Sequence, residues 1–220
     1  MDNIKHILVI LLLLVVANAG AQIPAEVGTV VKKCGEKMKS PAGVEMDMAL
    51  HVKALAVMSV NGSMKMYMRG DKSVVKMRIK MLGHEVKTET GSDGRQMWFL
   101  KHAVIDTDRD TLIVMPVSKK GEFDLDFNLH NEYRKAKMKE KNGRYEITFT
   151  DPKDKDMPRK TVMVVNKSDY TFHEMSVKDG ANGFTMTVTR LRFGVPESMF
   201  VLDESRYQGA VVVKRSFGDK

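Results

Sequence analysis

The stretch Glu45–Gly70, EMDMALHVKALAVMSVNGSMKMYMRG, alternates apolar and polar side chains over most of its length. Such alternation is typical of a β-strand with one buried face and one wet face, because successive side chains point to opposite sides. Asn61-Gly62 interrupts the pattern, and both residue types accept the positive φ of a tight hairpin turn. We therefore expect two strands joined there, with one apolar face continuing across the hairpin. That face carries Met46, Met48, Leu50, Val52, Ala54, Ala56, Met58, Val60, Met64, Met66 and Met68.

Methionine is unusually frequent on this face, and the whole chain contains 18 methionines. An unbranched, polarizable thioether repacks easily, which suits a cavity that accepts flexible apolar ligands. Thioethers are also soft ligands for Cu(I), but no histidine or cysteine joins this face, which disfavours copper. The third interpretation is an ordinary core in which methionine replaces leucine. Composition alone does not separate a cavity from a core.

The rest of the chain largely keeps the period-two pattern. Residues 26–39 are the exception, since their apolar side chains recur at helical spacing and Pro41 follows. The sequence pattern shows no alternation of helices with strands, as a parallel α/β fold would require. We therefore predict a mainly β (α+β) fold, in which a strongly curved antiparallel sheet forms an unclosed barrel packed on an N-terminal helix. The segment 121–130 is either a strand or a lid. Further strands are expected at 75–81, 85–90, 96–101, 104–108, 112–115, 161–167, 171–177 and 183–193, with a hairpin at 142–143 and a final apolar run at 211–213.

The first residues, MDNIKHILVILLLLVVANAGAQ, have the layout of a secretory signal peptide, with a lysine, an apolar run and small residues at the end. The apolar run is shorter than the ~20 residues that span a bilayer. We therefore expect residues 1–21 to be removed on export and residues 22–220 to form a single domain. The only cysteine, Cys34, has no partner for an internal disulfide, and an inert, partly buried thiol is expected.

Neither charge nor motifs indicate an enzyme or a nucleic-acid-binding protein. The net charge is +8, but the lysines are spread along alternating strand positions, as on a solvated sheet face. The sequence has no G-x-S-x-G, no H-E-x-x-H and no glycine-rich phosphate loop. The DTDRD segment lacks the central glycine and the later acid of a calcium loop. We predict a binding protein without catalytic activity, cofactor or metal, whose histidines are separate: His51, His84, His102, His130 and His173.

Two segments resemble the periplasmic outer-membrane lipoprotein carriers of the LolA type. SDGRQMWFL, Ser92–Leu100, is similar to that family's strand-turn signature, in which Ser-Asp-Gly precedes a Trp-Phe or Trp-Tyr pair. VPESMFVLD, Val195–Asp203, resembles the family's closing I-P-D-S-x-F segment. The resemblance implies an unclosed barrel, capped by helices, with an apolar cavity for lipoprotein acyl chains. It also implies a monomeric periplasmic chaperone that takes acylated lipoproteins from an inner-membrane exporter to an outer-membrane acceptor.

The chain departs from that family's pattern in three places. The F-x-Q element usual in the first strands has no clean copy here. KHAVIDTD stands where the family has a proline-rich apolar motif, and the arginine of the family's helical lid cannot be placed on any residue. For this reason no single functional residue is transferred by motif.

A methionine-rich wall would suit a carrier. Each buried acyl CH₂ contributes about 0.8 kcal/mol, so deep burial of long chains would hinder release, whereas a shallow, adaptable wall would ease transfer. The alternative hypothesis is a regulatory module on the same fold that senses a lipoprotein or a protein partner. For a carrier, we expect the acyl-binding surface to include Met46, Met48, Leu50, Met64, Met66, Met68, Met77 and Trp98.

Overall fold

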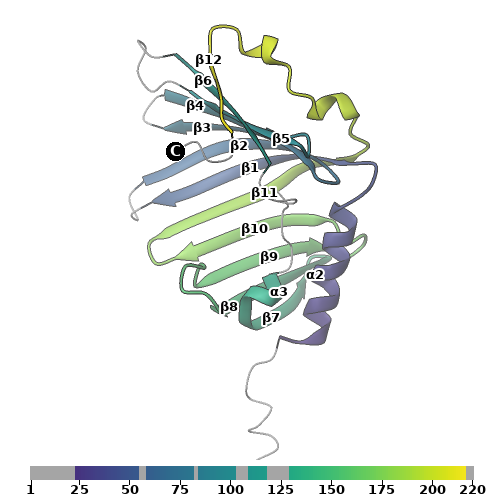
Figure 1. The fold of residues 1–220 in the computed structure, drawn as a ribbon. Coiled ribbons are helices and arrows are strands. Elements are labelled where there is room, and N and C mark those ends of the chain that lie inside the picture. The colour runs from purple at the N-terminus through teal and green to yellow at the C-terminus, as the bar shows by residue number, and fades with distance from the viewer. Residues whose placement is uncertain (1–22, 55–57, 82–83, 103–108, 118–128, 217–220) are drawn as a thin grey trace, which may run out of the picture.

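The computed structural model describes residues 23–54, 58–81, 84–102, 109–117 and 129–216 (Figure 1). The predicted signal peptide, the strand expected at 104–108 and most of the possible lid lie outside these described residues. The N-terminal helix is confirmed as α2, Ala25–Met38, and a short helix α3 covers Leu129–Glu132. None of the helices within the described residues is long and apolar enough to cross a membrane.

Strands make up most of the remainder. Two 3-10 helices, η1 (Glu197–Phe200) and η2 (Glu204–Tyr207), precede the last strand. The strands are β1 (Val44–Ala54), β2 (Met58–Arg69), β3 (Lys72–Met81), β4 (His84–Ser92), β5 (Gln96–Lys101), β6 (Thr111–Pro116), β7 (Tyr133–Lys141), β8 (Arg144–Pro152), β9 (Lys160–Asn166), β10 (Phe172–Asp179), β11 (Asn182–Phe193) and β12 (Val211–Lys214).

All these strands belong to one sheet, in the order β12-β6-β5-β4-β3-β2-β1-β11-β10-β9-β8-β7. The outermost strands, β12 and β7, do not pair with each other, so the barrel is unclosed and the predicted fold class is confirmed. One pairing differs from the antiparallel expectation, because β12 runs parallel to β6. Parallel neighbours need a long connection, and here the chain first crosses most of the sheet before β12 joins the edge.

The turn predicted at Asn61-Gly62 is wrong, because both residues lie inside β2 and the pairing of β1 with β2 extends to Ala54 opposite Met58. A Cβ atom at Gly62 would lie 2.5 Å from the main-chain carbonyl oxygen of Arg78 on β3. Glycine thus permits a close approach of two strands rather than a reversal of the chain. The apolar face nevertheless continues from β1 to β2, as predicted.

Side-chain alternation places two hydrophobic cores on opposite faces of the sheet. The inner face packs against α2, which buries Val27, Val30, Val31, Cys34 and Met38 there. The outer face of β3–β6 packs against the segment that carries η1 and η2. Figure 1 shows α2 along the half of the sheet formed by β7–β11, with the yellow C-terminal segment at the other half.

Candidate functional site: the methionine-rich inner face

The predicted methionines meet directly across neighbouring strands. Met46 is opposite Met66, and Met48 is opposite Met64 in the pairing of β1 with β2. Met64 is in turn opposite Met77 on β3. Directly opposed residues on one face have Cβ atoms about 5 Å apart, so their thioethers are within contact distance. The structure therefore brings these five residues together on the inner face.

The same face continues across the other half of the sheet, which the sequence pattern did not reveal. One row of opposed residues runs from β7 through β8, β9, β10 and β11 to Leu50 on β1. The alternation within each of these strands was visible, but which strands are neighbours depends on long-range pairing. The members of this row before Leu50 are Met138, Ile147, Met163, Met175 and Met186.

Burial divides the predicted residues into two groups. The side chains of Met46, Met48, Leu50 and Met66 are buried within the core that includes α2. The side chains of Met64, Met68 and Met77 are partly exposed and pack against the edge of that core. Only the second group presents thioether surface to a ligand in this conformation.

An apolar hollow of about 320 Å³ opens at one end of the inner face. Its walls include Val52, Val177 and Phe184, which are opposed in register across β1, β11 and β10. Lys53 and Asp179 also line it. A small, mostly apolar space with a few polar groups is the usual form of a site for an apolar ligand, and this volume is at the lower end of the usual range.

Helix α2 lies at the other end of the same face. The ammonium group of Lys37 lies 5.0 Å from the ring centroid of Phe193, the last residue of β11. Lys33 lies 4.6 Å from the ring centroid of Tyr170, just before β10. The hollow is at Phe184, nine residues before Phe193 on the same strand. This separation corresponds to about 30 Å along a strand. The inner face thus has a covered end and an open end.

Trp98 is separated from the methionines. It belongs to the outer core with Val74, Leu100 and Phe200, whereas the methionines belong to the inner core. Its indole lies over Gly91 on β4, where an added Cβ would come within 2.1 Å of the ring. Seven of the eight predicted residues therefore share the inner face, whereas Trp98 points to the opposite side of the sheet.

Cys34, the single cysteine of the chain, is buried on the inner face by α2. Burial, and secondarily the charge of Asp169, raise the pKa of the Cys34 thiol to about 12. A thiol with such a pKa is neither a nucleophile nor a metal ligand near neutral pH, because the thiolate is the reactive form. Among the described residues, no three His, Cys, Asp or Glu side chains are grouped so that they could hold a metal ion.

Comparison with solved structures identifies the architecture. An uncharacterized conserved protein from Thermus thermophilus shares it at 8% sequence identity, with a TM-score of 0.50, over 86% of this chain and 98% of that chain. The likeness is one of fold. No family model and no curated protein matches the sequence.

Two further solved structures are similar at lower TM-scores. The Mycobacterium tuberculosis lipoprotein LppX matches at 11% identity and a TM-score of 0.48, over 79% of this chain and 98% of that one. A LolA superfamily protein from Nitrosomonas europaea matches at 12% identity and a TM-score of 0.41, over 80% of this chain and 97% of that one.

Proposed function

We propose that this protein is a non-enzymatic, extracytoplasmic carrier that holds the acyl chains of lipoproteins on its inner face. The observation that carries the proposal is the methionine-rich inner face, which is buried with α2 over part of its length, partly exposed at Met64, Met68 and Met77, and hollowed beside Phe184. The LolA-like motifs and the names of the structural neighbours support the same assignment.

The dimensions suit an acyl chain. The hydrocarbon core of a bilayer is about 30 Å thick and contains two layers of lipid tails, so one tail spans about 15 Å. The distance from the hollow to the α2 end is about twice that length. Leu50 and Met186, next to the hollow, are buried in the same core as α2, so a tail entering at Phe184 would lie along the face only as these side chains repack.

Methionine side chains would limit the affinity of this face for an acyl chain. At about 0.8 kcal/mol per buried CH₂, full enclosure of a long tail would make release slow. Flexible thioethers can repack when the tail leaves, so the face does not need to stay open as an empty cavity. Loading by an inner-membrane exporter and unloading to an outer-membrane acceptor would both use this property.

The test compares two adjacent positions on β11 that point to opposite faces. Phe184→Gln places an amide in the hollow, whereas Thr185→Gln places the same group on the outer face. Titration with a dipalmitoyl lipopeptide and with a hydrophobic probe dye should show binding that Phe184→Gln weakens at least several-fold and Thr185→Gln leaves unchanged. A wild-type protein that binds neither probe would refute the proposal, as would equal binding by both variants.

A further inference from the structure

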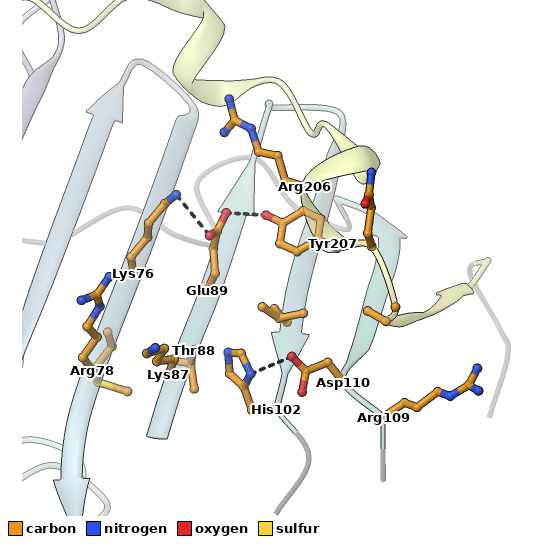
Figure 2. Close-up of a pocket in the computed structure, with 15 residues that line it drawn as sticks. Lys76, Arg78, Lys87, Thr88, Glu89, His102, Arg109, Asp110, Arg206 and Tyr207 are labelled. Atoms are coloured by element: carbon orange, nitrogen blue, oxygen red, sulfur yellow. Dashed lines mark hydrogen bonds and ion pairs between the residues drawn. The ribbon is translucent and has the colours of Figure 1, made fainter. Parts of the chain in front are cut away.

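A second, chemically different pocket lies on the outer face, beneath the C-terminal segment. It has a volume of about 680 Å³, and Figure 2 shows its lining side chains. The outer face of β3–β5 forms its floor, and residues 206–210 form its roof. Five of its side chains are Lys or Arg and two are carboxylates, so three positive charges are in excess. The cations are Lys76, Arg78, Lys87, Arg109 and Arg206.

Both carboxylates already have partners within the protein. Glu89 pairs with Lys76 at 3.2 Å and accepts a hydrogen bond from the Tyr207 hydroxyl at 2.5 Å (Figure 2). Asp110 lies 2.9 Å from Nδ1 of His102. Burial, and next the hydrogen bond to Glu89, raise the pKa of Tyr207 above its usual range, so the phenol stays a donor. Arg206 also has a carboxylate partner, Asp203 at 3.5 Å. Lys87 is paired with Glu85, so Arg78 and Arg109 are the lining cations without an ion pair among the described residues, and their charge is available to an external anion.

One pair of cations is placed against the normal rule for sheets. Arg78 on β3 is directly opposite Lys87 on β4, and like charges in opposed positions destabilise a sheet. The neighbouring pair, Lys76 with Glu89, has opposite charges. Lys87 turns to Glu85 at 3.1 Å, which leaves Arg78 without an ion pair among the described residues. The carboxylate of Glu85, whose pKa is lowered first by the hydrogen bond from Lys87 and also by the charge of Arg78, offsets part of this repulsion, and a bound anion would offset more of it.

The pocket also has an apolar part. Leu100 on the floor is 8% exposed, and the ring of Tyr207 packs against the outer core. Arginine and lysine side chains suit phosphate oxygens, which accept several charge-assisted hydrogen bonds at once. A phosphate ester with an attached glycerol or short apolar group matches both parts of the lining.

We propose that this outer pocket, separate from the acyl-binding inner face, binds the phosphate of a glycerophosphate-type head group. Both a soluble phosphate ester and an anionic phospholipid at a membrane surface present this chemistry. Binding at a membrane would bring the carrier to the surface where acyl chains are exchanged, while leaving the inner face free. This inference does not depend on the carrier function.

Two probes distinguish the possible sources. Calorimetric titration with glycerol 3-phosphate tests the soluble ester. Co-sedimentation with phosphatidylcholine vesicles, with and without phosphatidylglycerol, tests the membrane head group. Binding to either phosphate-bearing probe, weakened by salt, supports the proposal, and the probe that binds more tightly identifies the source. Binding to neither phosphate-bearing probe overturns the proposal. A parallel titration with polyglutamate serves as a comparison: binding to polyglutamate alone also overturns the proposal and would indicate an acidic protein partner.

The decisive variant is Arg78→Gln, with Arg192→Gln as the matched control on an exposed position of β11 outside the pocket. Arg78→Gln should lower the affinity about tenfold, the usual effect of losing one charge-assisted hydrogen bond, and the control should bind as the wild type does. Without ligand, Arg78→Gln should be at least as stable as the wild type, since the repulsion with Lys87 is removed. Equal affinity of both variants, or clear destabilisation by Arg78→Gln, would overturn the proposal.

Discussion

Met46 and Met64 lie on the same face of neighbouring strands, yet their side chains have different surroundings. Met46 is fully buried with the α2 side chains, whereas Met64 is partly exposed at the edge of the same core. Truncating a buried methionine leaves a cavity and typically costs about 2–5 kcal/mol. The two positions therefore separate packing from ligand contact.

We expect Met46→Ala to lower the free energy of unfolding by about 2–5 kcal/mol, and Met64→Ala to lower it by clearly less. Lipopeptide affinity, corrected for the folded fraction, should fall more in Met64→Ala than in Met46→Ala. Urea unfolding and lipopeptide titration measure the two effects. Equal losses of stability, with no change in affinity, would mean that the methionines serve only as core.

Cys34 gives a pH-dependent prediction. Its pKa in the folded protein is about 12, against an ordinary value of 9.0. Because the pKa is higher in the folded protein, the buried neutral thiol contributes fully to the free energy of unfolding below pH 9. Between pH 9 and 12 the thiol ionises in the unfolded chain but not in the folded protein, so the free energy of unfolding falls by up to about 1.4 kcal/mol per pH unit. Urea unfolding at pH 8, 9.5 and 10.5 should therefore show a steeper decline for the wild type than for Cys34→Ala. Parallel declines would contradict the buried thiol.

Among the elements, β4 and β5 illustrate what the sequence could and could not predict. The strands themselves follow from period-two alternation, which covalent geometry imposes on any extended chain. The motif SDGRQMWFL placed Trp98 in a strand correctly, but its face depends on the register of β5 against β4. Gly91, directly opposite Trp98, leaves the space that the indole fills.

The dependence on pairing between strands also explains why the turn predicted at Asn61-Gly62 is wrong and why the methionines of β9–β11 were not predicted as part of the inner face. An Asn-Gly pair permits a turn without requiring one, and the close approach of β3 to Gly62 decided the outcome. Met163, Met175 and Met186 joined the inner face only because β11 pairs with β1, a contact between residues far apart in the chain. Local patterns predict elements, whereas pairing between distant strands assembles the site.

Gly91→Ala should displace the indole of Trp98, because the new Cβ would come within 2.1 Å of it. We expect a loss of about 1–3 kcal/mol in unfolding free energy, together with a red shift of the fluorescence of the chain's single tryptophan. Urea unfolding followed by tryptophan emission measures both.

Gly28→Ala in α2 is the matched control for this substitution. Nothing lies within 4 Å of a Cβ at Gly28, so alanine should stabilise the helix by up to about 1 kcal/mol. If Gly91→Ala were as well tolerated as Gly28→Ala, the packing of Trp98 over β4 would be wrong.

At the scale of the whole molecule, one unclosed sheet separates two kinds of surface. The inner face is apolar and rich in methionine, and the outer face of β3–β5 carries an excess of cations. A carrier of acylated proteins needs both to hold lipid tails and to approach anionic surfaces. The proposed acyl-binding face and the proposed phosphate pocket therefore lie on opposite sides of the sheet, and each could be removed by substitution without the other.

The most direct measurement is mass spectrometry of the protein isolated, under mild conditions, from the extracytoplasmic fraction of cells that export it. If the inner face carries acyl chains, di- or tri-acylated lipoproteins should co-purify with the wild type and with Thr185→Gln, and should be depleted with Phe184→Gln. Recovery of the wild type with bound copper, or with a single soluble partner and no lipid, would contradict the carrier function.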